Sequence, residues 1–381
     1  MLIYFFIYIP FVLCAFFDFF KTSQKNKNTI LWFWVIVFTL FRGLRWEIGT
    51  DWNQFFDVYS HSGWDNIFSY YRDNWSNKVM DYGYMFINAL FNETGFPYTV
   101  FLLVTNFWIM WCFMDFSKRH SKYPILTLIM LMNIGVPFPV RQTIAFATSL
   151  WGYRFVVEKK WLKFIIVAII ASLIHKGSLI CLIVIFIRAI LSRYNIKWWG
   201  YAIVYLSTFL IASIFRYYIT IAMTFLADVG GQISEYSSSY MNMDSTSVDY
   251  GNFNNSLLNG LSYSVFFAIL LYVREKYNTI CVEKIKAFEF FFLLYAISAI
   301  IENLIRLGVS SGSTEVLGRV FMTINMFPLM MPLIFTIFIS LHVKNRYICY
   351  WGFCGYMLYK FWLQIPGDFY HDLYIPYNSV L

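Results

Sequence analysis

Five basic residues lie at or just inside the ends of strongly apolar segments, and their types and positions are suited to chemistry. They are Arg42, Arg45, Arg141, His175 and Arg319. A charged side chain at membrane depth is costly, so a group of them marks a functional site by default. When the apolar segments are threaded through a bilayer, all five fall on the same, non-cytoplasmic side. Several cations that face one cavity favour a strongly anionic ligand, such as a lipid-linked pyrophosphate.

Arg42 and Arg45 are three residues apart on the outer half of one predicted helix, where they would share a face. Glu47, Thr50 and Asp51 follow directly and could pair with them. Arginines that merely snorkel from a helix end would give the same pattern. The spacing therefore leaves two interpretations open, an anion site and a membrane-interface anchor.

Arg141 follows the segment 136–140, whose two prolines interrupt a helix at membrane depth. Irregular backbone at that depth is tolerated where it lines a cavity or is buried in protein. Arg141 then begins the next predicted helix, at the positive end of the helix dipole. A cation is unfavourable there, so we expect an anionic group to compensate it. The backbone N–H of Gln142 would add a donor for an anion.

His175 ends an almost uninterrupted apolar run, residues 164–174. Histidine titrates near neutral pH, which makes it the natural general base for a sugar hydroxyl, although a lone interfacial histidine is often structural. Lys176 follows it and could contact a phosphate. Arg319 opens a long apolar segment, and so repeats the situation of Arg141.

The composition sets the class of protein that must position these residues. Of the 381 residues 59% are hydrophobic and only 13% are charged, whereas soluble domains carry about 25% charged residues. We therefore predict an all-α, polytopic integral membrane protein. The net charge of +8 comes from basic residues in short loops between apolar runs, so no nucleic-acid partner is expected. No CxxC, DxD, HExxH or Walker A motif occurs, so we expect no metal, no disulfide and no cofactor.

About twelve apolar segments are candidates for membrane spans of roughly 20 residues. They lie at about 2–20, 29–46, 97–116, 123–139, 141–157, 162–175, 177–191, 199–216, 257–273, 287–304, 318–341 and 347–363. Clusters of lysine and arginine occupy every second connection, while most acidic residues lie on the other side. This pattern predicts that both termini are outside and that the basic connections are cytoplasmic.

Two long segments are predicted on the outer side, at 47–96 and 217–256. The first is rich in Trp, Tyr and Asp, contains Tyr59, and includes an amphipathic stretch at about 82–92 that is too short to span and would lie at the interface. The second is rich in Ser, Asn and Tyr. Such side chains suit sugar recognition, although a solvated loop has the same composition. Residues 1–381 are predicted to form a single membrane-embedded domain.

A set of short motifs runs along the chain in a fixed order: Gly49-Thr50-Asp51-Trp52, Tyr59, Asp81-Tyr82-Gly83-Tyr84, Arg141-Gln142, His175, Arg319 and Pro376-Tyr377. Over nearly the whole chain this set resembles the EpsG-like branch of the Wzy-type polysaccharide polymerases, which make O-antigens, capsules and exopolysaccharides. Two departures occur, since Asp81 stands where the family more often has Glu, and Gly177 where Ser or Thr often follows the histidine.

The resemblance implies a metal-independent glycosyltransferase at the outer face of the bacterial inner membrane. Its substrate would be undecaprenyl-pyrophosphate-linked oligosaccharide in the membrane lipid, and a chain-length regulator could be a protein partner. The catalytic residues expected on this basis are Arg141, Arg319 and His175, the last as the general base or as the group that orients an acidic base. The implied substrate-binding residues are Arg42, Arg45, Asp51, Tyr59, Lys176 and Gln142.

Three other functions share some of these features. A flippase for the same lipid-linked sugar would also suit twelve helices and a cationic cavity, but transporters often show two related halves, which we do not find here. An acyltransferase would need a histidine on the cytoplasmic side; His120 lies there, within a basic loop that we interpret as a topology determinant. A ligase that transfers finished polymer to another lipid has the same chemistry and remains open.

Overall fold

The computed structural model describes residues 2–20, 22–49, 52–68, 80–132, 140–193, 196–228, 264–276, 288–308, 322–364, 375 and 377–380. Regular secondary structure within these ranges is entirely helical, as the composition predicts. The chain divides into two compact units, one of residues 1–179 and 331–381 and the other of residues 180–330.

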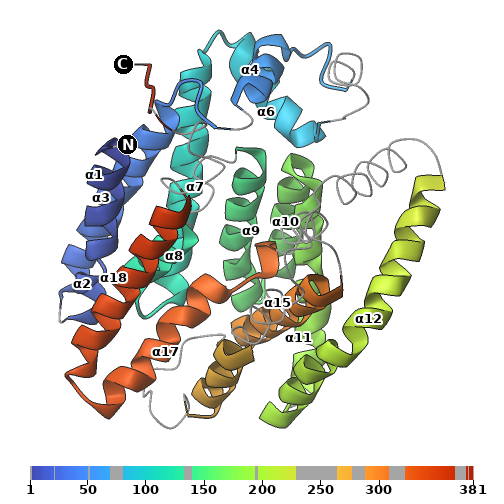
Figure 1. Cartoon of the computed structure of the whole chain (residues 1–381). Coiled ribbons are helices and arrows are strands. Elements are labelled where there is room, and N and C mark those ends of the chain that lie inside the picture. The colour runs from blue at the N-terminus through green and yellow to red at the C-terminus, as the bar shows by residue number, and fades with distance from the viewer. Residues whose placement is uncertain are drawn as a thin grey trace. The chain divides into compact units, whose positions relative to one another are not determined.

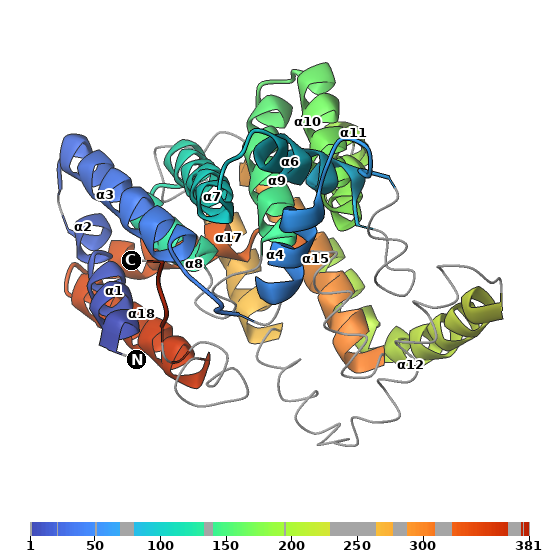
Figure 2. The same ribbon diagram turned by 90° about the horizontal axis from the view of Figure 1, so that it is seen from above.

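The first unit holds every described residue of the predicted site. Its helices are α1 (Leu2–Leu13), α2 (Phe16–Phe19), α3 (Gln24–Gly43), α4 (Trp52–His61), α6 (Tyr82–Glu93), α7 (Tyr98–His120), α8 (Pro124–Leu131), α9 (Arg141–Val157), α10 (Trp161–Ile174) and α18 (Asn345–Gln364). α3 packs on α7, α7 on α9 and α9 on α10, which gives the row of helices in Figure 1. The short helices α4 and α6 lie across one end of this row (Figures 1 and 2).

Small residues let these helices approach closely. A Cβ atom on Gly43 would lie 2.6 Å from Cδ2 of Leu103, at the contact between α3 and α7. A Cβ on Gly152 would lie 2.9 Å from Cγ1 of Val167, at the contact between α9 and α10. Helices that associate in membranes use small residues in this way.

The ion pairs at one end of the row agree with the prediction that basic clusters occupy every second connection between the helices. Asp115 at the end of α7 lies 2.8 Å from Arg119 and 3.8 Å from Arg154 at the end of α9. The Arg154 guanidinium also lies 4.0 Å from the centre of the Trp151 ring. The basic ends of α7 and α9 are therefore together, at the end opposite to Arg141, where α9 begins.

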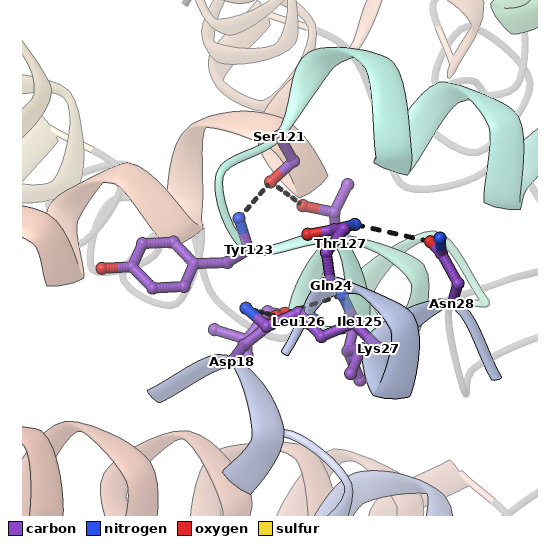
Figure 3. Close-up of polar contacts among 9 residues, drawn as sticks. All are labelled: Asp18, Gln24, Lys27, Asn28, Ser121, Tyr123, Ile125, Leu126 and Thr127. Atoms are coloured by element: carbon purple, nitrogen blue, oxygen red, sulfur yellow. Dashed lines mark hydrogen bonds and ion pairs between the residues drawn. The ribbon is translucent and has the colours of Figure 1, made fainter. Parts of the chain in front are cut away.

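A buried carboxylate joins three helices within the same unit (Figure 3). Asp18 of α2 accepts hydrogen bonds from the backbone N–H groups of Ile125 (2.7 Å) and Leu126 (2.9 Å), in the first turn of α8. Lys27 of α3 lies 2.9 Å from the other carboxylate oxygen. Asp18 thus satisfies N–H groups that a helix N-terminus leaves without a partner, and its charge is balanced by Lys27.

The second unit contains α12 (Trp198–Asp228) and α15 (Phe288–Gly308), which pack together, and α11 (Ile183–Arg193), which packs on α15. Tyr205 of α12 stacks on Phe267 at a ring-centre distance of 4.5 Å, and residues 264–276 are helical. The predicted outer segment 217–256 begins as a continuation of α12 to Asp228, and its remainder lies outside the described residues.

Several predicted spans agree with helices and others need correction. The spans at 141–157 and 162–175 coincide with α9 and α10, and the amphipathic stretch at 82–92 is α6. The span at 177–191 begins as a 3-10 helix, Lys176–Leu182. In the span at 318–341, residues 318–321 lie outside the described residues, a 3-10 turn covers Met322–Ile324, and α17 covers Phe327–Leu341. The Asn325 side chain accepts the Phe327 N–H at 2.9 Å, which caps the start of α17.

Two helices are long and apolar enough to cross a membrane among the residues described, Leu2–Phe19 and Tyr98–His120. Shorter apolar helices include Trp161–Ile174, Trp198–Ile211 and Phe327–Leu341. The count of about twelve spans therefore stays a prediction.

Candidate active site

Asp81 is the centre of the candidate site. Its Oδ2 atom lies 3.2 Å from Nη1 of Arg141 and 3.6 Å from Nδ1 of His175. The Asp81 side chain is only 6% exposed, whereas those of Arg141 and His175 are 25% and 22% exposed. One buried carboxylate thus holds a guanidinium and an imidazole that both remain accessible to a ligand.

The contact between α6 and α10 brings Asp81 to His175. Asp81 directly precedes α6, and its carbonyl accepts the N–H groups of Tyr84 and Met85 that start the helix. Two residues later, a Cβ on Gly83 would lie 2.8 Å from the carbonyl carbon of Leu173. Only a glycine allows the α6 backbone to approach the last turn of α10 so closely.

His175 occupies the position at which α10 ends. Its backbone is extended (φ −152°, ψ 115°), and its N–H still donates to the carbonyl of Ala171 at 2.9 Å. The negative charge of Asp81 beside Nδ1 favours the tautomer that is protonated at this nitrogen. Nε2 then carries the lone pair and is the atom available to accept a proton from a ligand.

Arg141 begins α9, as the sequence predicts, and Asp81 is the anionic group that was expected to compensate it. A cation at the positive end of a helix dipole is destabilised unless an anion lies nearby. Nη1 of Arg141 also lies 2.8 Å from the sulfur of Met80. The guanidinium is therefore anchored by two consecutive residues that precede α6.

Arg42 and Arg45 are almost completely buried, at 3% and 2% exposure. The prediction that they share one helix face is wrong, because α3 ends at Gly43, where the helix meets Leu103 of α7. Arg42 lies in the last turn and donates from Nη2 to the carbonyl of Met132 at 3.5 Å. Arg45 lies beyond the helix, where it forms an isolated antiparallel bridge with Ser379.

Tyr84 connects Arg45 with the group around Asp81. The Tyr84 side chain is fully buried in α6, and burial is the main cause that raises the pKa of its phenol well above the ordinary value. The positive charges of Arg141 and Arg45 oppose this rise. The charges of both arginines therefore influence the surroundings of this one hydroxyl.

The remaining predicted residues fall into different environments. Lys176 is exposed directly after His175, and Gln142 is partly exposed in the first turn of α9. Tyr59 is buried: its hydroxyl donates to the carbonyl of Phe96 and its ring packs against Tyr98. This position fits a packing role, and the substrate contact expected for Tyr59 stays a prediction.

Two predicted residues, Asp51 and Arg319, lie outside the described ranges. Within the described ranges, no three His, Cys, Asp or Glu side chains gather in a way that could hold a metal ion. Sequence reasoning gave no role to Asp81 or Gly83, although both stand in the motif Asp81-Tyr82-Gly83-Tyr84. That motif was the signal that could have found them.

The chain matches the model of the EpsG family over residues 28–379. No curated protein and no solved structure matches it. The matched range includes every residue of the candidate site, and with the apolar helices it indicates a membrane protein with a polysaccharide polymerase-like role. Since the match covers most of its length, the chain belongs to the EpsG family.

Proposed function

We propose that this protein is a polysaccharide polymerase that joins undecaprenyl-pyrophosphate-linked oligosaccharide repeat units at the outer face of the inner membrane. The observation that carries the proposal is the position of Asp81 between Arg141 and His175. This arrangement supplies a base, a group that orients the base and a cation for an anionic leaving group. Glycosyl transfer from a pyrophosphate needs these three elements when no metal takes part.

In the proposed reaction His175 acts on the acceptor sugar. Its Nε2 takes the proton of a hydroxyl group on the incoming lipid-linked unit as the hydroxyl oxygen attacks the anomeric carbon of the growing chain. Asp81, beside Nδ1, holds the imidazole in the required tautomer and stabilises the imidazolium that forms. Hydrolytic triads also place a carboxylate beside the imidazole, but there the two are hydrogen-bonded, whereas Oδ2 of Asp81 lies 3.6 Å from Nδ1 of His175, which is longer than a hydrogen bond.

The bond that breaks joins the anomeric carbon to the pyrophosphate, which leaves with the electron pair. Arg141, whose side chain is 25% exposed, is a cation accessible to it. Arg42 and Arg45 are buried, so we propose that they act through their charge in low-dielectric surroundings rather than by direct contact. With Asp81 ionised, these three arginines leave an excess of positive charge, which suits the doubly charged pyrophosphate diester.

The other candidate functions find less support in the described residues. His120, the histidine that a cytoplasmic acyltransferase would use, is buried at 5% exposure and packs against Phe116 at a ring distance of 5.1 Å. A ligase would use the same three residues for the same chemistry, so only the acceptor distinguishes it from a polymerase. A flippase would need the cations but not the base, so the requirement for His175 distinguishes it.

The test is complementation of a strain that lacks this protein, with surface polysaccharide resolved on a gel. Wild type should restore a ladder of polymer, whereas Arg141→Ala and His175→Ala should leave a single repeat unit. Arg119→Ala is the matched control, because Arg119 forms its ion pair at the opposite end of the unit. Repeat units that accumulate on the cytoplasmic side of the null strain would identify a flippase, and finished polymer that accumulates on undecaprenyl would identify a ligase.

A further inference from the structure

Residues 377–380 lie against the end of α3, far away in the sequence (Figure 1). The ring of Tyr377 stacks on Phe41 with a centre distance of 4.8 Å and an interplanar angle of 14°. It also meets Tyr4 edge-on at 5.9 Å. The Tyr377 hydroxyl donates to the carbonyl of Phe41 at 2.6 Å. One aromatic side chain thus makes both an apolar and a polar contact with the last turn of α3.

The backbone of residues 377–380 pairs with the residues that follow α3. The N–H of Val380 donates to the carbonyl of Leu44 at 3.0 Å, and the N–H of Trp46 donates to the carbonyl of Asn378 at 3.0 Å. The Ser379 hydroxyl gives the Leu44 carbonyl a second donor at 3.2 Å. These bonds lie on both sides of the antiparallel bridge formed by Arg45.

These contacts have the chemistry of a helix C-cap. The last four carbonyl groups of an α-helix have no partner within the helix, and a glycine-based turn commonly supplies one. Here the carbonyl of Phe41, in the last turn of α3, accepts the Tyr377 hydroxyl, and the carbonyl of Leu44, the residue after the helix, accepts the Val380 N–H. Residues 377–380 therefore complete the end of α3.

We propose that residues 377–380 are a built-in cap that fixes Arg42 and Arg45 for the pyrophosphate of the donor, and that Tyr377 is a positioning residue. Arg42 lies inside the capped turn and Arg45 forms the antiparallel bridge with Ser379, so the cap fixes the backbone of both. This inference rests on the proposed function for its ligand, but the cap itself can be measured without any activity.

A fixed backbone matters because Arg42 and Arg45 are buried, so the effect of their charges on the pyrophosphate depends on where the backbone holds them. A buried charge stabilises an anion only if it is held before the anion arrives, since later reorganisation would consume the gain. Burial raises the pKa of Tyr377 to about 12, and the positive charge of Arg45 opposes this rise. The Arg45 charge therefore acts on Tyr377, and loss of the Tyr377 side chain would alter the immediate surroundings of Arg45.

The experiment compares wild type with Tyr377→Ala, which loses the ring and the hydroxyl, and Tyr377→Phe, which keeps the ring. Tyr359→Ala is the matched control, because Tyr359 is 60% exposed on α18. Hydrogen exchange of purified protein is measured by mass spectrometry on peptides that cover residues 40–48. Polymer synthesis is measured against the concentration of undecaprenyl-pyrophosphate-linked repeat unit, with protein amount and monodispersity checked for each variant.

Tyr377→Ala should speed exchange in residues 40–48 and raise KM for the lipid-linked unit about tenfold. The change in kcat should be far smaller, because the charges of Arg42 and Arg45 attract the pyrophosphate in the bound substrate as well as during the reaction. Tyr377→Phe should show a smaller effect of the same kind, and Tyr359→Ala should show none.

Unchanged exchange in Tyr377→Ala would overturn the proposal that residues 377–380 cap α3. Faster exchange with unchanged KM, or a loss confined to kcat, would overturn its role in positioning the arginines. Wild-type protein that makes no polymer would refute the proposed function, while the exchange data would still decide on the cap.

Discussion

Gly83 of α6 lies so close to Leu173 of α10 that any side chain at position 83 would collide with backbone atoms. An added Cβ would be 2.8 Å from the carbonyl carbon and 2.9 Å from the carbonyl oxygen of Leu173. Asp81 directly precedes α6, two residues before Gly83, and His175 directly follows α10, two residues after Leu173. The distance between the carboxylate and the imidazole is therefore set by a glycine that does not itself take part in chemistry.

Gly83→Ala should separate α6 from α10 and remove Asp81 from His175. We expect polymer synthesis to fall at least about tenfold, since a displacement of about 1 Å can cost far more than that in a catalytic site. Gly352→Ala on α18 is the control, because an added Cβ there meets nothing within 4 Å. Equal polymer yields from the two variants would show that the close contact does not set the site.

Asp81→Asn keeps the shape of the side chain and removes its charge. It should lower polymer synthesis by about 100- to 10,000-fold, the range expected when general base catalysis is lost. Asp81→Glu should keep more activity than Asp81→Asn, because the negative charge remains. Asp57→Asn is the control, since Asp57 pairs with His61 at 3.2 Å on the exposed surface of α4. Equal rates for Asp81→Asn and Asp81→Glu would argue against a role for the charge.

The helices that carry the site could largely be predicted from the sequence, whereas its contacts could not. Both ends of α9 followed from the prolines before Arg141 and the charged residues after Val157. The need for an anion beside Arg141 followed from the helix dipole. That this anion is Asp81 depends on how α6 crosses the ends of α9 and α10, and local patterns do not encode such packing.

The end of α3 shows the same limit. Hydropathy extended this helix to residue 46, because Leu44 and Trp46 are apolar, but the structure ends it at Gly43. The partner that ends it is residues 377–380, more than three hundred positions away in the chain. A window of neighbouring residues contains no information about such a partner, although Pro376-Tyr377 stood out as a motif.

Asp18 should contribute to stability rather than to catalysis. Asp18→Ala would leave two N–H groups of α8 and the charge of Lys27 without their partner. Removing one member of a buried ion pair costs about 3–5 kcal/mol, so thermal unfolding of the purified protein should shift to clearly lower temperature. Asp18→Asn keeps an acceptor oxygen and should lose less. A Tm for Asp18→Ala equal to that of wild type would contradict this role.

Two exposed lysines test the predicted orientation. Each cysteine is introduced into a variant that lacks the native cysteines. Lys176→Cys, beside the site, should react with a membrane-impermeant maleimide when the outer cell envelope has been permeabilised and the inner membrane is still closed. Lys159→Cys, in the connection between α9 and α10, should react only after lysis, because that connection is predicted to be cytoplasmic. The reverse pattern of labelling would place the site on the cytoplasmic side and exclude an outer-face polymerase.

The decisive measurement is polymer synthesis by purified protein in vesicles, with undecaprenyl-pyrophosphate-linked repeat units as the sole substrate. Wild type should convert them into a ladder of longer chains and release undecaprenyl pyrophosphate, while Asp81→Asn and His175→Ala should leave them unconverted. Ladders of normal length from either variant, at equal protein amounts, would contradict the assignment of Asp81 and His175 as catalytic residues.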